Sequence, residues 1–267
     1  MTIAYPITFN QNPTSSSPYP TADLESDFDA TAGCYSDAGT TPCVDSDPVQ
    51  EWHEQSGGGI EGEQTDASAQ PIWYASDIAR NNKSYVDFDG SDWIEVLGTL
   101  NYRSDNMTIY LVMDPDWGSV GSYDTFIHKG NDFDWDEGWV GYFATGGADI
   151  VSCVNAWSSN SVSNSDAGGP AAITFGIRFK TDAVTYQNGN QVDSNSEETD
   201  SSFTGFPGTL APLTKALIGT TYDSGPSDPS SSFAYTGKIF RILIYSEYHD
   251  TTTFDQVLTD LQTEYNI

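Results

Sequence analysis

The sequence predicts an all-β protein, a two-sheet antiparallel jelly-roll sandwich with a short C-terminal helix. Three observations predict this fold. Strand-like segments of alternating or continuous apolar residues recur along the chain, turns rich in Gly and Asn separate them, and helical spacing is convincing only near the C-terminus. Many strands with few helices are typical of sandwiches and barrels. The length of 267 residues suits one large all-β domain or two small domains.

Three segments carry the strongest strand patterns. Residues 108–113 form a near-continuous apolar run, which suits a strand buried on both faces. Residues 173–180 alternate between apolar and polar side chains, which is typical of a strand with one buried and one solvated face. Residues 238–245 give the best single strand pattern in the chain. We therefore expect all three segments in the sheets of the sandwich.

A hairpin is expected around Asn188 and Gly189. These two residues separate the extended segments 184–187 and 190–192. A two-residue type I′ turn needs positive φ at both central positions, which Asn and Gly tolerate. The dipeptide is therefore the strongest short-range signal for two antiparallel strands in this sequence.

The C-terminal helix is predicted from one apolar face. The residues of that face recur at helical spacing, and they are Phe254, Val257, Leu258, Leu261 and Tyr265. Thr252, followed three positions later by Asp255, resembles a capping box. We therefore expect Thr252 to cap the helix.

The charge balance excludes several partners. The chain has 39 acidic and 9 basic side chains, a formal net charge of -30 and a sequence pI near 4.1. Nucleic acid and anionic lipid are both recognised through Lys and Arg, so neither is an expected partner. Abundant Asp, Glu, Ser and Thr with few Lys are typical of a protein from a saline environment. The alternative is a merely acidic secreted or phage protein.

From the sequence we expect neither a membrane segment nor a signal peptide. It has no run of about 18 apolar residues, and its first residues lack the basic and apolar regions of a secretory signal. Residues 1–25 are rich in Pro, Ser, Thr and Asn and are interpreted as an extended N-terminal arm or linker. Residues 26–267 are expected to form the jelly-roll domain, with residues 26–83 as a lead-in segment packed on it.

The three cysteines suggest at most one disulfide. Cys34 and Cys43 bracket a short loop and could form a disulfide, although two free thiols are the alternative. Cys153 lies in a short apolar stretch and is expected to be a buried small residue. No Cys/His spacing in the chain resembles a zinc site.

Several segments carry, in order, the motifs of one known family. Residues 85–96 contain an apolar-x-Phe-Asp-Gly motif followed by an aromatic residue and an apolar strand. Further strand-like segments follow at 108–116, 126–130, 186–190, 217–219 and 237–245. In their order and spacing these segments resemble the laminin-G-like, concanavalin A-like lectin/glucanase domains. The resemblance covers about residues 84–267 and implies a jelly-roll of two curved antiparallel sheets.

The segment before these motifs resembles the lead-in of such domains in virion-associated phage proteins. Residues 47–59 follow most of the pattern, although Glu54-Gln55 stands where an Asp-x pair is common. We expect this segment to contribute a strand and to pack Trp52 on the sandwich.

The densest acidic cluster is a candidate calcium site. Asp132, Asp134 and Asp136 could offer oxygen ligands to Ca²⁺. A solvated acidic loop is the alternative. Asp132, Asp134 and Glu137 also share the spacing of the carboxylates in laminarinase-type glucanases, where two carboxyls perform retaining hydrolysis. The first of those carboxylates is Glu in the family and Asp here, so no catalytic residue is assigned.

Tryptophans in or beside polar loops are candidate glycan contacts, because an indole face can stack on a sugar ring. They are Trp117, Trp135, Trp139 and Trp157. The alternative is that they cover sheet edges or lie at subunit contacts.

Together these features favour a non-enzymatic virion structural protein with a lectin-like domain. It would be a capsid decoration, turret or tail-fibre subunit, located on the extracellular particle. The expected partners are further copies of the chain, other virion proteins and host surface glycans. The alternatives are a free carbohydrate-binding module and a glucanase-type glycoside hydrolase.

The charge count predicts that salt stabilises the fold. The Debye length falls from about 8 Å at physiological salt to about 3 Å at 1 M, so repulsion between surface carboxylates fades in brine. The urea midpoint should rise as NaCl is raised from about 0.01 M to above about 1 M. A midpoint that stays constant across this range would contradict the saline interpretation.

Overall fold

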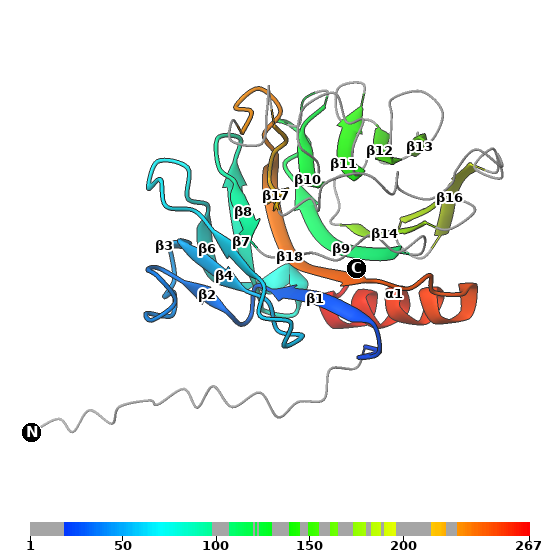
Figure 1. Ribbon diagram of the computed structural model, residues 1–267, viewed down its shortest axis with the longest axis horizontal. Coiled ribbons are helices and arrows are strands. Elements are labelled where there is room, and N and C mark those ends of the chain that lie inside the picture. Colours follow the sequence, from blue (N-terminus) through cyan, green and yellow to red (C-terminus); the bar gives the residue numbers. More distant parts are fainter. Residues whose placement is uncertain are drawn as a thin grey trace, which may run out of the picture.

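The computed structural model describes residues 19–97, 107–119, 121, 123–129, 139–144, 149–154, 161–164, 173–179, 183–187, 190–195, 215–222 and 229–267. The described strands form two nine-stranded antiparallel sheets, and one helix, α1 (Thr251–Tyr265), lies against the outer face of one of them (Figure 1). The predicted fold class is therefore confirmed. Within the described residues, no helix combines the length and apolar character that crossing a membrane requires.

Sheet A forms the middle layer, between α1 and the second sheet. Its order is β16-β15-β14-β9-β18-β7-β6-β3, and β1 also pairs with β18. The bounds are β1 (Leu24–Asp29), β3 (Asp47–Pro48), β6 (Ile72–Asp77), β7 (Lys83–Asp89), β9 (Met107–Pro115), β14 (Ile173–Phe179), β15 (Ala183–Gln187), β16 (Asn190–Asn195) and β18 (Thr236–Tyr245).

Sheet B forms the opposite outer layer. Its order is β13-β12-β11-β10-β17-β8-β5-β4-β2. The bounds are β2 (Cys34–Tyr35), β4 (Glu51–His53), β5 (Glu61–Glu63), β8 (Ile94–Leu97), β10 (Thr125–Lys129), β11 (Trp139–Ala144), β12 (Asp149–Val154), β13 (Ser161–Asn164) and β17 (Lys215–Ile218). Strands from the first ninety residues therefore extend both sheets, and a short 3-10 helix, η1 (Ile78–Arg80), links β6 to β7.

The continuous apolar run in β9 is explained by burial on both faces, as predicted. Ile109 and Leu111 enter the core between the two sheets, whereas Tyr110 and Val112 enter a second core beneath α1. The neighbouring strand β18 divides its side chains between the same two cores. Residues 107–113 of β9 and 239–245 of β18 are buried on both faces, so neither stretch shows a regular polar alternation.

The predicted hairpin is present. Strands β15 and β16 pair in antiparallel fashion with Gln187 opposite Asn190, which leaves two residues for the turn. The alternating segment forms strand β14, as predicted, and β14 lies between β9 and β15.

The helix has the predicted apolar face but a different cap. Phe254, Val257, Leu258, Leu261 and Tyr265 are all buried. The prediction that Thr252 caps the helix is wrong, because Asp250 is the N-cap and its carboxylate accepts a bond of 2.8 Å from the backbone N–H of Thr253. Asp250 has the extended backbone that a cap needs, whereas Thr252 already lies in the first helical turn.

A buried charge network joins β1, β18 and α1. The Arg241 side chain is 7% exposed and makes a two-point contact with Asp27, at 2.9 Å from Nε and 2.7 Å from Nη2. Glu264 of α1 lies 3.4 Å from Arg241 Nη1 and also accepts from Lys83 and Tyr19. Burial alone would raise the pKa of Glu264, but these hydrogen bonds and the nearby positive charges hold it below its ordinary value.

This network predicts a large loss of stability in Arg241→Met. The substitution leaves Asp27 buried without a counter-charge, which should cost about 3–5 kcal/mol of unfolding free energy. The matched change Lys238→Met, on the same strand, should cost about 1 kcal/mol, because Lys238 is more exposed and its partner Asp77 keeps a bond from Ala79 N–H. Urea denaturation measures the free energy of unfolding of both variants. Equal losses would show that the Arg241–Asp27 pair stabilises the fold no more than the Lys238–Asp77 pair does.

Candidate ligand-binding site

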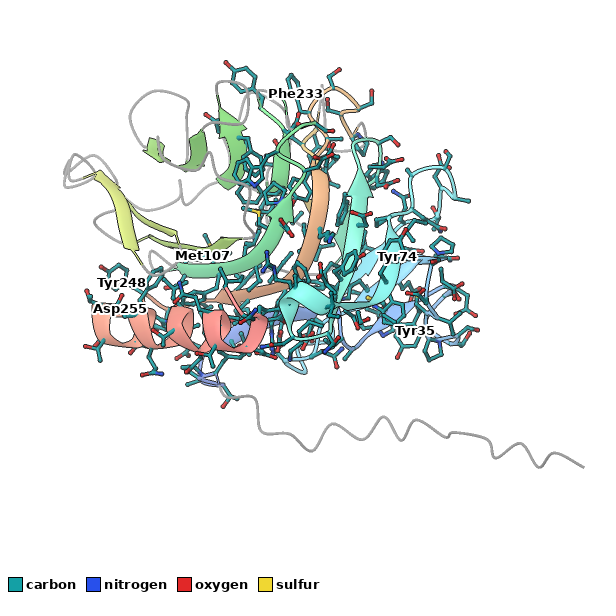
Figure 2. All side chains as sticks on the ribbon, turned by 180° about the vertical axis from the view of Figure 1, so that it is seen from behind. Tyr35, Tyr74, Met107, Phe233, Tyr248 and Asp255 are labelled. Carbon is teal, nitrogen blue, oxygen red and sulfur yellow. The ribbon has the colours of Figure 1, made fainter. Side chains whose placement is uncertain are left out.

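A concave pocket of about 570 Å³ lies between the loop after β1, the segment before β3, and β6. Its volume is within the range of roughly 300–1,000 Å³ that is common for small-molecule sites. Most of the lining side chains are apolar or small, and the residues used below are Cys34, Cys43, Val44, Asp45, Trp73 and Ser84. These segments lie at the end of the molecule marked by Tyr35 and Tyr74, away from Asp255 of α1 (Figure 2).

Trp73 provides a fixed aromatic wall. It lies in β6 with its ring half-buried against the core between the sheets. Its indole Nε1–H donates to the backbone oxygen of Ala30 over 2.7 Å. Because this bond and the core contact hold the ring in one orientation, the part of the ring that lines the pocket is a rigid apolar surface.

A short hairpin forms another wall. Tyr35 bridges Pro42, and Cys43 N–H donates to the Cys34 oxygen over 3.0 Å, so residues 34–43 fold back on themselves. Val44 follows the hairpin and is 65% exposed at the rim. The pocket is therefore bounded by a core tryptophan and by a turn near the surface.

Few polar groups line the pocket, and the charged one is negative. One oxygen of the exposed Asp45 carboxylate accepts from Ala75 N–H over 3.0 Å, and Ser84 Oγ donates to the Ala75 oxygen over 2.9 Å. No Lys or Arg is among the described lining residues. In a chain of net charge -30 this environment opposes an anionic ligand and accepts a neutral one.

The three histidines have different surroundings. His128 is 1% exposed, its Nδ1 contacts Thr221 Oγ1 at 3.0 Å, and burial lowers its pKa to about 3, so it is neutral at physiological pH. His249 is buried and bonded to Tyr110. His53 instead lies near the surface between two carboxylates, Glu51 and Glu61. Within the described residues, the donor atoms of Glu51, His53 and Glu61 lie close enough together to hold a metal ion.

Most of the residues predicted from sequence to contact glycan or calcium lie outside the described residues. They are Asp132, Asp134, Trp135, Asp136 and Trp157. Trp139 begins β11, where its backbone pairs with Lys129 and Val154. Both the calcium site and these glycan contacts stay predictions.

Trp117 is the one of these residues whose side chain the structure describes. Its ring is half-buried against the core and meets Phe143 edge-on, with the ring centroids 5.7 Å apart. This contact packs Trp117 against the core, and its predicted contact with glycan stays a prediction.

The disulfide predicted for Cys34 and Cys43 is not formed in the structure, where both residues are buried free thiols. Burial raises the pKa of the Cys43 thiol to about 12 and that of Cys34 well above its ordinary value. Disulfide formation proceeds through the thiolate, so both thiols are poorly reactive at neutral pH. The two residues still face each other across the hairpin, and their oxidation stays a prediction.

Trp73 and the Glu51–His53–Glu61 group were missed by the sequence analysis. Trp73 lies in the lead-in segment, whereas all of the tryptophans predicted to contact glycan follow residue 116. The Glu51-Trp52-His53 triplet held a usable signal, because two polar residues flanking an apolar one share a face of a strand. Its partner Glu61 is found only once the pairing of β4 with β5 is known.

Comparisons with known proteins support the fold alone. No protein-family model and no curated protein matches the sequence. Among solved structures, the binding domain of Paraclostridial Mosquitocidal Protein 1 is similar with a TM-score of 0.58 and 12% identity, over 90% of this chain and 52% of that chain. The botulinum neurotoxin serotype C1 binding domain is similar with a TM-score of 0.53 and 13% identity, over 91% of this chain and 53% of that one.

A third similar structure is the binding domain of botulinum neurotoxin DC in complex with SialylT, with a TM-score of 0.51 and 9% identity, over 91% of this chain and 52% of that chain. The chain spans about half the length of these proteins. The class is thus a two-sheet β-sandwich of the architecture found in these binding domains, and the two-sheet sandwich predicted from the sequence is confirmed.

Proposed function

We propose that the chain is a non-enzymatic glycan-binding domain that takes an uncharged sugar in the pocket beside Trp73. The observation that carries the proposal is the indole ring held in one orientation on the wall of a concave, mostly apolar pocket. Sugar-binding sites need such a ring together with a few polar groups that fix orientation. Asp45, whose second carboxylate oxygen has no described partner, supplies an acceptor for a sugar hydroxyl.

The similar solved structures support a binding role, because they are binding domains and one of them is in complex with SialylT. The charge of the pocket argues for a different ligand here. A sialylated sugar carries a carboxylate, which would approach Asp45 without a Lys or Arg in the described lining to compensate. A neutral hexose or an amino sugar avoids this repulsion.

Glycoside hydrolysis is the less favoured alternative. The carboxylates that would perform it, Asp132, Asp134 and Glu137, lie outside the described residues, so this activity rests on the sequence resemblance alone. Release of reducing sugar from β-glucans, abolished by Asp134→Asn, would establish the hydrolase and overturn the non-enzymatic proposal.

The pocket predicts a specific pattern on a glycan array. The protein should bind neutral glycans in preference to their sialylated forms, and Val44→Glu should abolish this binding. Val44 is exposed at the rim, so this change adds a bulky negative group at the entrance without disturbing the core. Trp73→Ala should weaken binding by about 10-fold or more, the effect of removing a central aromatic contact worth over 1 kcal/mol.

Tyr74→Ala is the matched control, because Tyr74 is the next residue of β6 and stacks on Tyr85 instead of lining the pocket. It should leave glycan retention unchanged. Equal losses of glycan binding in Tyr74→Ala and Trp73→Ala would indicate a general loss of folding. A wild-type protein that binds no glycan on the array would contradict the glycan proposal.

For the biological setting we propose a structural subunit of a virus particle in a saline habitat. This finer role is supported by the sequence of the lead-in segment and by the acidic composition. Residues of that segment form β1 to β6, whose strands join both sheets, and Trp52 is fully buried in the core. Homo-oligomers and contacts with other virion proteins belong to the same proposal.

The particle role predicts where the protein is found. Mass spectrometry of purified particles from the source culture should detect the chain in several copies, and light scattering should show the purified chain as an oligomer. A stable monomer that is absent from every particle fraction would contradict the role. The glycan array is independent of this result, so a free glycan-binding module would remain distinguishable.

A further inference from the structure

We propose that Glu51, His53 and Glu61 form a binding site for a divalent transition-metal ion, and we commit to Zn²⁺. The site lies on the outer face of sheet B, on β4 and β5. It is separate from the pocket beside Trp73 and from the acidic cluster at residues 132–136, and it does not depend on glycan binding.

Strand register brings the three side chains together. In β4, Trp52 points into the core and is fully buried, so Glu51 and His53 on either side of it share the outer face. In β5, Glu61 lies directly opposite His53. Side chains at directly paired positions lie on the same face and close together. The buried Trp52 anchors the strand from below, which makes this a rigid platform for two of the donors.

The donor distances suit a small ion after a modest adjustment. His53 Nε2 lies 2.7 Å from Glu51 Oε2 and 3.8 Å from Glu61 Oε1. In a tetrahedral zinc site, bonds of about 2.0–2.1 Å place ligand atoms about 3.3–3.4 Å apart. One gap must therefore open and the other close by about half an ångström. The Glu61 side chain is 54% exposed and can close the longer gap. Opening the shorter gap requires a small shift of Glu51 or His53 themselves.

The hairpin at residues 34–43 encloses the two inner donors. A Cβ on Gly39 would lie 2.7 Å from Glu51 Oε2 and 2.9 Å from His53 Cε1, so the hairpin approaches both ligand side chains at a distance that glycine permits, with φ of +73°. The Tyr35 ring packs on the imidazole with centroids 4.6 Å apart. Two donors are thus held in place from the hairpin side, and the approach from Glu61 stays open.

The charges around the group call for a cation. Glu63 lies directly opposite Glu51, and like charges at paired positions repel. Among the described residues, His53 is the one basic side chain within salt-bridge distance of Glu51 or Glu61. A bound dication would place two positive charges among these carboxylates.

The donor set selects the kind of ion. One imidazole nitrogen with two carboxylate oxygens suits zinc and its neighbours, whereas Ca²⁺ and Mg²⁺ prefer oxygen ligands alone. Three protein ligands leave the fourth tetrahedral position for water.

Calorimetric titration of the chelator-treated full-length chain with Zn²⁺ tests the site. We expect one Zn²⁺ site that Ca²⁺ in the same range does not occupy. His53→Gln and Glu61→Gln should weaken Zn²⁺ binding by at least about 100-fold, since even the loss of an outer-shell partner costs 10–100-fold. Absence of Zn²⁺ binding, or equal binding by wild type and both variants, would overturn the proposal.

Glu63→Gln is the matched control. It removes the same charge from the same strand and face but takes away no proposed ligand, so Zn²⁺ binding should stay within about threefold of wild type. Thermal unfolding without metal verifies that each variant folds, and the exposed position of Glu61 makes its variant the safest. An equal loss in Glu63→Gln and Glu61→Gln would show a diffuse attraction to acidic surface and would overturn the site.

Discussion

The fold depends on β18, a strand that pairs along both edges and whose residues 239–245 are buried on both faces. Along one edge it pairs with β9, and along the other it pairs first with β7 and then with β1. Its side chains fill the core between the sheets and the core beneath α1. The one charged side chain held deep in this strand is Arg241, whose contacts with Asp27 and Glu264 fix the first strand and the last helix to the middle of the sandwich.

Much of this architecture could be predicted from local patterns. The apolar run at 108–113 and the strand pattern at 238–245 identified the two central strands, because burial on both faces removes polar alternation. The apolar face of α1 was evident from its spacing, but the cap was misplaced. Thr252 and Asp250 are both good caps by residue type, and only the extended backbone at Asp250 distinguishes them.

The candidate sites were harder to predict because they depend on pairs distant in sequence. Strands β2 to β5 are two or three residues long, too short for a periodic signal. Their register brings Glu61 to His53, and the approach of β6 to the loop after β1 places Trp73 beside the pocket. The cysteines show the same limit, since sequence spacing allowed a disulfide but could not indicate burial that keeps both thiols protonated.

The hairpin of residues 34–43 contacts both candidate sites, one on each of its sides. Cys34 and Cys43 face the pocket, and Tyr35 and Gly39 cover the Glu51–His53 pair. Any ligand that orders this hairpin from one side reduces the conformational entropy left to lose on the other. If both proposed sites are occupied, binding at one would therefore be linked to binding at the other, and the factor by which one occupant changes the affinity of the other would be the same in both directions.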